Sequence, residues 1–575
     1  MGKPPEISHL PMSRKRTARP KLSPTQFIKG TIIRLKLAKK VKVRDEKPGP
    51  DGTRGARVQF QLIWRRVAIL FVILCALGWI SLATGGYFFV KEKRNFPDVR
   101  FVDIAFPNRW PLYRLALGDY YIKQAQEKLE AGEVEGVLHL LRVGVQQSPD
   151  NTEGRLMLAQ IYNSIGRPDL GIDLLQARVA EHADDPSYLN PLISLLFANH
   201  EDVAVEKLAT GLLDGSKEPT DRNLALALAA ATANFNRGNY DRAQEFIDDF
   251  ELLKSRTGTI LQARIHWDLG DSEQAILLLE RVVGNPGVLE AQAVDYLIEY
   301  LWSSGREDRA ERVAVSRFIA DPLAFAPRLR LLYVRNKRGD TAKEASEIET
   351  YFAGFGDDQE AMRGLAEFAA KTAKPDLAKR VLEQVQARRL DSAWPALFLL
   401  EAYVAADQAP AALGFYETIE KETSEWTPLQ QARLQPILAT AYFGAGETER
   451  GETVLNEILV LRRGANMSDL LVLAQRLKDM EYANRARIVL NHIHLKQPLN
   501  QEALTRLIQL DLETGNNREM VRNIKSLLEM RKPSLTVLET AHSHISSDRF
   551  LFQANRESTL ESIEAALNGG RPQDS

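Results

Sequence analysis

Cysteine is almost absent from this sequence of 575 residues. The single cysteine, Cys75, lies inside an apolar run, so no intramolecular disulfide can form. The same count excludes zinc sites built from cysteine alone and CxxC redox chemistry. A body without cysteine is compatible with an oxidising compartment.

Sequence motifs of common enzymes are also missing. The chain contains no GxxxxGK[ST], HExxH, GxSxG or EF-hand loop, and no GxGxxG that follows a strand. Its nine histidines are scattered, apart from the pairs His492/His494 and His542/His544. Residues in an i,i+2 relation on a helix point about 200° apart, so neither pair suits one metal ion. We therefore expect no metal, no cofactor and no enzyme activity.

The net charge of −1 hides an uneven distribution. Residues 1–66 carry 18 Lys and Arg against 4 Asp and Glu, whereas the remainder carries 57 against 72. A basic arm and an acidic body of this kind are expected to occupy different environments or to meet different partners. Hydrophobic residues at 44% and charged residues at 26% are typical of folded protein over most of the length.

One apolar run, Val67 to Val90, has 24 residues without a charge and is long enough to cross a bilayer. Because the preceding arm is strongly basic, we expect the N-terminus in the cytoplasm and the repeat array on the periplasmic or extracytoplasmic side of the inner membrane. A buried helix of a soluble protein is one alternative. Another is a signal peptide cleaved after Ala83, because Ser81-Leu82-Ala83 has the small-x-small form.

The segments that flank this run differ in composition. Residues 1–66 are expected to be a basic and mostly disordered arm, with a turn-rich linker over 45–58. Within the arm, residues 23–44 mix aliphatic side chains with many Lys, which suits contact with anionic lipid, a solvated tail that enforces topology, or a cytoplasmic partner. No nucleic-acid-binding module is recognisable, so nucleic acid is not expected. Residues 91–114 are an aromatic, Pro-rich linker, in which Val99 to Phe101 is either a short strand or part of a lid.

A spacing that recurs along the remaining chain is its most informative feature. A small or aliphatic residue is followed by Gly seven positions later, by Ala five positions after that and often by a closing Pro, as in Ala263, Gly270, Ala275 and Pro286. The same spacing returns in Ile298, Gly305, Ala310 and Pro322. A period of roughly 34 residues with two amphipathic helices per unit indicates a stacked helical solenoid. Gly is expected in the left-handed conformation at the end of each first helix.

These units resemble tetratricopeptide repeats. The resemblance covers residues 115–533 as about twelve helix-turn-helix units and implies an all-α, right-handed helical solenoid. Closing helices are expected over 534–567 and a disordered tail over 568–575. Units near 187–220 and 392–427 fit poorly, and Gly171 and Gly451 stand where the pattern has Ala.

In the resembled family, the first helix of each repeat lines a concave groove that holds a partner. Carried over by position, the resemblance implies that these residues face the groove: Arg264, Trp267, Asp268, Asp295, Glu299, Trp302, Tyr333, Asn336, Lys337, Arg363, Glu367 and Lys371. Trp267 and Trp302 are 35 residues apart and are predicted to form a ladder on the groove wall, which a peptide or an amphipathic helix would follow. Alternatively, both indole rings simply pack between repeats.

Taken together, these features predict a membrane-tethered scaffold or assembly factor that binds envelope proteins in a concave groove. A second hypothesis is an enzyme, or a non-catalytic subunit of one, with a site hidden in the irregular units. In a third, the basic arm carries the function by linking the outer domain to a cytoplasmic partner.

Overall fold

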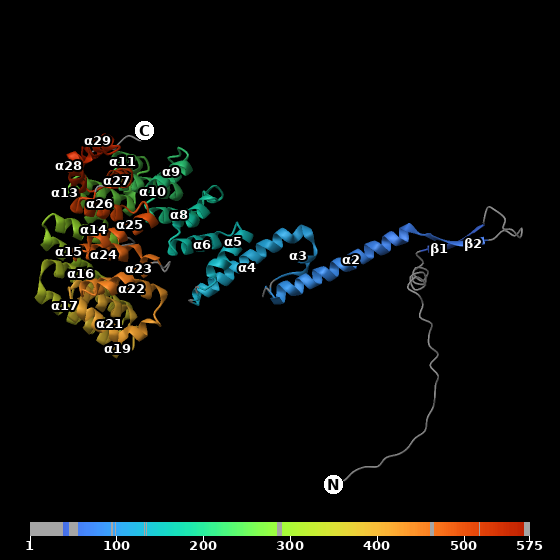
Figure 1. The fold of residues 1–575 in the computed structure, drawn as a ribbon. Coiled ribbons are helices and arrows are strands. Elements are labelled where there is room, and N and C mark those ends of the chain that lie inside the picture. Colours follow the sequence, from blue (N-terminus) through green and yellow to red (C-terminus); the bar gives the residue numbers. More distant parts are fainter. Residues whose placement is uncertain are drawn as a thin grey trace, which may run out of the picture. The chain divides into compact units, whose positions relative to one another are not determined.

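The computed structural model describes residues 38–44, 56–93, 96–97, 99–131, 133, 135–284, 290–460, 465–516 and 518–568 (Figure 1). The chain divides into two compact units, residues 1–154 and 155–575, which are described separately. The predicted disordered segments 1–22 and 569–575 and the predicted lipid-contacting residues 23–37 lie outside the described residues.

The described part of the arm contains a two-stranded antiparallel hairpin, which was not predicted; the expectation that the arm is mostly disordered stays a prediction. Strand β1 (Ala38–Arg44) pairs with β2 (Ala56–Leu62), with Val41 opposite Gln59 and Val43 opposite Arg57. Strand β2 alternates apolar and polar side chains throughout, and β1 does so from Lys40 to Arg44, which is the period of a strand. The many lysines of β1 conceal this alternation when the segment is read for charge alone.

A long apolar helix follows the hairpin. Helix α2 (Trp64–Phe88) continues through the π-helical turn η1 (Phe89–Lys93). It is long and apolar enough to cross a membrane, with a mean hydropathy of 2.5, and only 6% of its apolar window is buried. Its apolar side chains are largely exposed, Leu82 at 74%. Ala83 lies within the helix and is buried.

The predicted linker is folded. It contains α3 (Phe101–Ala105), η2 (Pro107–Arg109) and the first residues of α4 (Trp110–Glu130), which pairs with α5 (Val137–Gln147). Val99 to Phe101 is not a strand, contrary to one of the two alternatives. Proline at the first turns of η2 and α4 explains the helical start, because proline suits the first helical position.

The rest of the chain alternates first and second helices of successive hairpins, and this confirms the all-α helical solenoid. The first helices are α6 (Thr152–Ser164), α8 (Pro186–Ala198), α10 (Asp221–Arg237), α12 (Arg256–Asp268), α14 (Glu290–Ser303), α16 (Phe325–Arg338), α18 (Gln359–Lys371), α20 (Ala393–Ala405), α22 (Pro428–Gly444), α24 (Met467–Asp479), α26 (Gln501–Thr514) and α28 (Leu535–Ile545). The second helices are α7 (Pro168–Gln176), α9 (Asp202–Leu213), α11 (Tyr240–Asp249), α13 (Ser272–Val283), α15 (Glu307–Ala320), α17 (Thr341–Phe355), α19 (Pro375–Ala387), α21 (Ala409–Thr423), α23 (Thr448–Val460), α25 (Ala483–Lys496), α27 (Met520–Glu529) and α29 (Arg556–Leu567).

In the described part of the array, short 3-10 turns interrupt this alternation at η3 (Val179–His182), η4 (Leu252–Lys254) and η5 (Asp548–Phe550). Within the described residues, twelve hairpins run from α4/α5 to α26/α27, and α28 and α29 follow them. The poorly fitting stretches 187–220 and 392–427 also form hairpins, α8/α9 and α20/α21.

The turn inside each hairpin explains both the regular and the irregular units. Gly238, Gly270, Gly305 and Gly446 have φ between 71° and 86°, which confirms the predicted left-handed cap. In four other hairpins a residue with a side chain takes the same place and conformation: His200, Ala373, Asp407 and Glu481 have φ between 52° and 67°. The turn is therefore kept where the glycine signal is lost.

Close helix contact accounts for the small residues. Ala263, Ala275 and Ala310 are completely buried, as expected where two helices cross. At Gly171 a Cβ would lie 2.9 Å from the carbonyl oxygen of Ala159, so even alanine would force the two helices apart. The departure from the repeat pattern at that position therefore allows a closer approach of α7 to α6.

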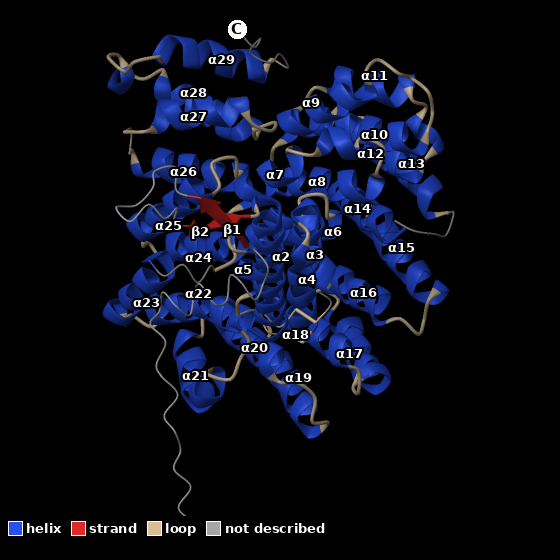
Figure 2. Ribbon diagram, turned by 90° about the vertical axis from the view of Figure 1, so that its right-hand side faces the viewer, coloured by secondary structure: helices blue, strands red, loops and turns tan. Residues whose placement is uncertain are grey.

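The second unit closes on itself. The loop between α27 and α28 contacts the early hairpins, because Arg531 pairs with Asp202 of α9 and the Lys532 amide donates to the carbonyl of Asn236 in α10. Figure 2 shows the hairpins from α8/α9 to α26/α27 arranged around a centre, with first helices such as α16, α18 and α22 inside and second helices such as α17, α19 and α23 outside. The repeats of this unit thus form a ring.

Candidate functional site

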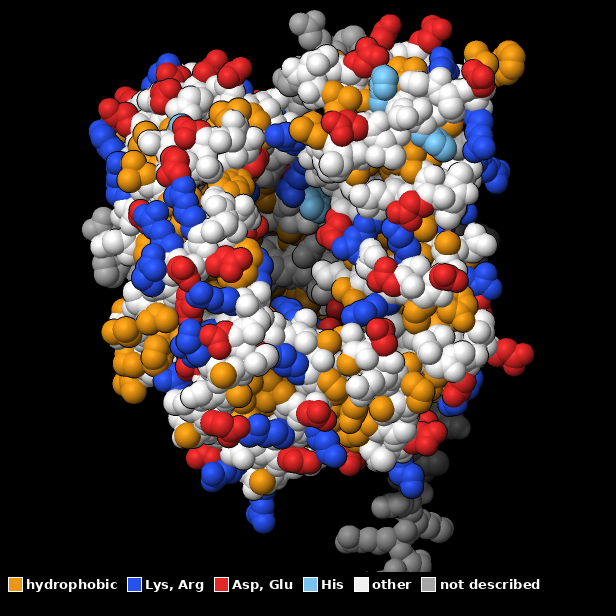
Figure 3. Space-filling model, turned by 90° about the vertical axis from the view of Figure 1, so that its left-hand side faces the viewer, with side chains coloured by type: hydrophobic (Ala, Val, Ile, Leu, Met, Phe, Trp, Pro, Cys, Tyr) orange, Lys and Arg blue, Asp and Glu red, His pale blue; other side chains and the backbone are white. Residues whose placement is uncertain are grey.

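The candidate site is the inner wall, which we define as the surface formed by the first helices α10 to α28 of the ring. The face of the second unit seen in Figure 3 is hollowed at its middle, and side chains of both charges surround the opening. Three hollows in the second unit are lined wholly or mainly by first helices. The concave surface expected from the repeat pattern therefore lies on the inside of a closed ring and not along an open superhelix.

The first hollow, of about 390 Å³, lies between α14 and α16 and contains four of the predicted groove residues, Asp295, Trp302, Tyr333 and Lys337. The Lys337 ammonium lies 4.7 Å from the centre of the Trp302 ring, a cation–π distance. Arg330 donates to Asp295 across the two helices at 2.5 Å. Burial, with a smaller effect of Glu367, raises the pKa of Tyr333 to about 12, so its hydroxyl stays neutral.

Predicted residues on α12 are engaged in packing between repeats. Arg264 lies over the rings of Phe235 at 4.3 Å and Tyr296 at 5.3 Å, and so joins α10, α12 and α14. The indole of Trp267 stacks on Tyr300 with 3.9 Å between ring centres and 5° between planes. Trp267 therefore packs between repeats, whereas Trp302 lines a hollow, and no ring contact between the two indoles is seen.

The remaining predicted residues are spread along neighbouring helices. Asp268 accepts a hydrogen bond of 2.9 Å from the Tyr240 hydroxyl, close to the ring closure. Arg363 lies 4.5 Å from the Trp394 ring, and Glu367 pairs with Lys371 at 2.7 Å within α18. Glu299 is exposed on α14. Asn336 donates to Glu344 of α17 at 3.4 Å, which directs it toward a second helix.

A second hollow, of about 130 Å³, is formed by α18, α20, α22 and α24. Apolar residues such as Val472 line it together with five charged residues: Lys371, Glu401, Arg433, Asp469 and Arg476. Arg433 pairs with Glu401 at 3.0 Å. Burial raises the pKa of Asp469, which Arg433 opposes and Glu401 reinforces.

Sequence reasoning missed this second hollow except for Lys371. Helix α20 belongs to one of the poorly fitting units, so its register could not be carried over from the repeat pattern. The signal that could have indicated this hollow is the charge of Glu401, Arg433 and Asp469, because each of these residues lies on a first helix.

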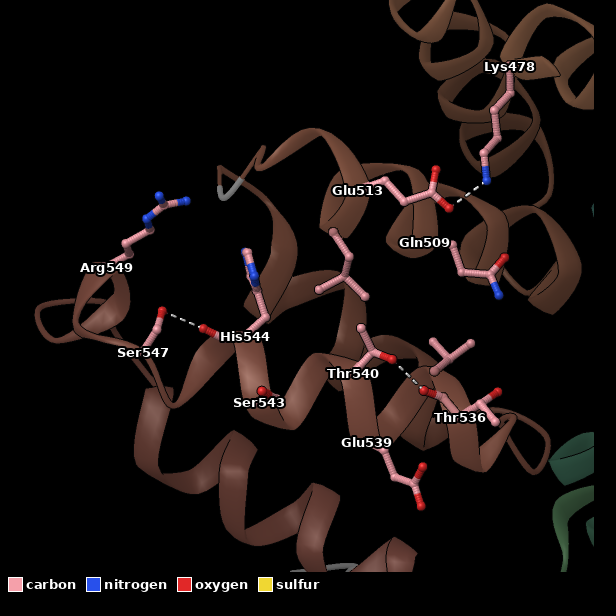
Figure 4. Close-up of a pocket in the computed structure, with 12 residues that line it drawn as sticks. Lys478, Gln509, Glu513, Thr536, Glu539, Thr540, Ser543, His544, Ser547 and Arg549 are labelled. Carbon is pink, nitrogen blue, oxygen red and sulfur yellow. Dashed lines mark hydrogen bonds and ion pairs between the residues drawn. The ribbon is translucent and has the colours of Figure 1, made fainter. Parts of the chain in front are cut away.

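The third hollow, of about 900 Å³, is wide and polar (Figure 4). Lys478 of α24 faces Glu513 of α26 at one end, 2.6 Å apart, and Arg549 lies at the other. Between them lie residues of α28, including His544, whose ring contacts Phe550. None of these residues was predicted. Lys478 and Glu513 lie within the repeat array but were not among the positions carried over, and the residues of α28 and η5 follow residue 533, where the repeat pattern ends.

The first two hollows are lined mainly by aromatic, aliphatic and charged side chains. Among the described residues, no group of three or more His, Cys, Asp or Glu is placed to hold a metal ion. The second hollow has one lining hydroxyl, that of Thr440, and it donates to the Pro436 carbonyl at 2.8 Å. Aromatic rings, guanidinium groups and carboxylates at the junctions of repeats are typical of surfaces that hold another chain.

Comparison with known proteins supports the repeat assignment for part of the chain. The tetratricopeptide-repeat family matches residues 128–193. No curated protein matches the sequence. Several solved structures align with this chain. One is a Naa15/Naa10 complex bound to HypK-THB, which aligns at 15% sequence identity over 86% of this chain and 79% of that chain, with a TM-score of 0.30.

Two further structures are of the same kind. Yeast Tom70 matches at 13% identity over 84% of this chain and 99% of its own, with a TM-score of 0.33. The pentatricopeptide repeat protein PPR10, in complex with an 18-nt psaJ RNA element, matches at 14% identity over 80% and 69%, with a TM-score of 0.37. Identities and scores this low carry no information on the ligand of this chain.

Proposed function

We propose that this chain is a membrane-tethered scaffold whose ring binds an extended segment or a helix of a partner protein along the inner wall. The observation that carries the proposal is the alignment of three hollows on consecutive first helices, from α14 to α28. Each hollow spans neighbouring repeats, so one elongated ligand can contact several of them in turn. A wall of this form suits a peptide or helix better than a compact small molecule.

The charges of the hollows specify the contacts. In the first hollow Lys337 offers a cation beside the Trp302 ring. In the second, no hydrogen bond or ion pair is found for the guanidinium of Arg476 among the described residues, so it is available to a partner's carboxylate. Both signs of charge are present, so the expected ligand carries acidic and basic groups beside apolar anchors.

The proposed tether is helix α2, with the basic arm in the cytoplasm and the ring outside the inner membrane of a bacterial envelope. Attachment to the bilayer raises the effective concentration of the ring near envelope proteins without any new contact. The proposal assigns binding contacts to Asp469 and its neighbours and includes no catalytic step.

Site-specific photo-crosslinking tests the inner wall. A photoreactive amino acid at Lys337 or at Val472, both exposed in hollows, is expected to give discrete adducts with a partner in native membranes. The same amino acid at Lys379 of α19 or Glu457 of α23, exposed on second helices, is expected to give none. Equal adducts at all four positions would remove the inner wall as the binding surface.

Charge reversal gives an independent check. The double variant Lys337→Glu/Arg476→Glu is expected to abolish the adducts formed from Val472, whereas Lys379→Glu/Arg380→Glu, the same change on α19, is expected to preserve them. Circular dichroism should show equal helicity in both variants. Preserved adducts in the first variant would contradict the role of these cations.

A further inference from the structure

The segment between the apolar helix and the first repeat returns along α2 instead of leading away from it. This return segment, residues 99–112, contains α3, η2 and the start of α4. The Trp79 indole nitrogen donates to the Ala105 carbonyl at 2.6 Å, and Ile104 lies 3.4 Å from the Cβ position of Gly86. Tyr87 and Phe101 form an edge-to-face ring pair at 6.1 Å.

The Trp79 contact fixes the depth of the return segment along α2. With a rise of about 1.5 Å per residue, about 20 residues cross the hydrocarbon core, and counted from Val67, the first residue of the charge-free run, they end near Gly86. Trp79 then lies about 10 Å inside that boundary. Ala105 is held at the same level. Helices that lie in a membrane interface are buried to a depth of about 5–10 Å, which matches this position.

The outer surface of the return segment is apolar. Phe106 is 55% exposed and Leu112 58%, and Val102 and Trp110 are also exposed. The part of α2 that the segment contacts also carries exposed apolar side chains, such as Leu82 three residues after Trp79. An apolar surface of this extent is rarely left in water, and its packing against the apolar helix indicates the same solvent.

Several backbone groups and one charge pair of the segment have partners within it or on α2, which lowers the cost of a low-dielectric environment. The Ala105 carbonyl accepts from Trp79, and the Ile104 carbonyl accepts from the Trp110 indole at 3.1 Å. The Phe106 amide donates to the Val102 carbonyl at 3.2 Å. Asp103 and Arg109 form an ion pair at 3.4 Å, which offsets the two charges.

From these contacts we propose that the return segment is a second lipid-contacting element, seated in the leaflet at the C-terminal end of α2 with Phe106, Trp110 and Leu112 among the acyl chains. This inference rests on the proposed membrane span of α2. The occupant of the apolar surface is phospholipid. Insertion at this point sets the depth of α2 and the direction in which α4 leaves the membrane.

The single native cysteine makes a labelling test direct. In a Cys75→Ser background, single cysteines at Phe106 and Leu112 are compared with one at Lys123, which is exposed on α4. The full chain is reconstituted in phosphatidylcholine–phosphatidylglycerol vesicles and treated with a membrane-impermeant maleimide. Phe106→Cys and Leu112→Cys are expected to react at least about tenfold more slowly than Lys123→Cys, and all three to react equally in SDS. Equal rates in vesicles would overturn the proposal.

The native protein separates this outcome from failure of the span itself. If Cys75 of the unmodified chain is labelled in vesicles, α2 does not span the membrane, and the proposal for the return segment is wrong as well. If Cys75 is protected while Phe106→Cys reacts as fast as Lys123→Cys, only the return segment is wrong.

Brominated phospholipids distinguish lipid from protein as the cause of protection. A fluorophore on Phe106→Cys should be quenched by lipids brominated near the headgroup end of the acyl chain, and one on Lys123→Cys should not. Protection without quenching would show that protein covers the surface and would overturn the proposal.

Discussion

The Arg531 guanidinium donates from Nε to Oδ2 of Asp202 at 2.7 Å, although 329 residues separate the two in the chain. The Asp202 side chain is 3% exposed and also accepts from Asn236 at 2.7 Å. One residue further on, the Lys532 ammonium donates to the Tyr240 hydroxyl at 2.8 Å, which in turn donates to Asp268. These contacts join the two ends of the ring, and they define what we call the clasp: Asp202, Asn236, Tyr240, Arg531 and Lys532.

The first prediction concerns this pair. Arg531→Ala leaves a buried carboxylate without its cation and is expected to cost about 3 kcal/mol, because removing one partner of a buried pair is far more harmful than removing both. The double variant Arg531→Met/Asp202→Asn should therefore lose less than the single variant. Hydrogen exchange of α8, α9 and α27 in the full chain measures the loss locally.

An exposed pair serves as the control for the clasp. Arg388 and Asp357 are 2.8 Å apart with side chains 55% and 75% exposed, so Arg388→Ala should change protection by less than about 1 kcal/mol. Loss of protection spread evenly over all repeats in Arg531→Ala, rather than confined to the hairpins that meet, would contradict ring closure.

The second prediction concerns acid. Burial lowers the pKa of His200, beside the clasp, and Arg531 acts in the same direction, while Asp202 and Glu502 oppose it. The folded chain therefore keeps His200 neutral at a pH at which the unfolded chain is protonated. The resulting stability is complete above the ordinary histidine pKa of about 6.5 and is lost as pH falls from there toward the lower folded value.

Hydrogen exchange at the clasp, corrected for intrinsic rates, should thus weaken below about pH 6.5. His200→Asn should remove this dependence, because asparagine tolerates the left-handed conformation that His200 adopts at φ 61°. His492, whose pKa is also lowered by burial, lies on α25, away from the clasp contacts. If His492→Gln removed the pH dependence instead, His200 would not be its source.

The third prediction concerns the hairpin turns. Ala373 holds φ 52° at the position where other repeats have glycine. A left-handed residue with a Cβ costs about 1 kcal/mol relative to glycine, so Ala373→Gly should stabilise the ring by about that amount. Gly446→Ala, at φ 79°, should destabilise it by a similar amount. Urea unfolding followed by circular dichroism gives both differences, and a destabilising Ala373→Gly would show that its Cβ makes a needed contact.

The fourth prediction separates the two tryptophans. Trp267 is stacked between repeats, so Trp267→Ala should reduce the free energy of unfolding by about 2–3 kcal/mol. Trp302 lines the first hollow, and Trp302→Ala should cost less stability but reduce the adducts formed from Val472. Equal losses of stability would place both indoles in packing, which was the alternative expected from the sequence.

The sequence alone determined the repeating unit of this protein. The spacing of Gly270 and Ala275 reflects local constraints, namely a left-handed cap and a helix crossing, so it can be read without any long-range information. The apolar length of α2 is a local property as well. The hairpin of β1 and β2 shows the limit of this reading, because its alternation was present but weaker than the charge of the same residues.

Only the tertiary structure decided what the repeats build. Small rotations between successive hairpins add up over the array, and no local residue pattern encodes their sum, so the meeting of Asp202 with Arg531 could not be inferred. For the same reason Trp267 and Trp302, equivalent in the repeat, differ in the fold: the first has Tyr300 as its neighbour and the second has Lys337 and a hollow. The position of a residue within its repeat follows from local sequence constraints. The side chains that surround it depend on which residues the neighbouring repeat places against it.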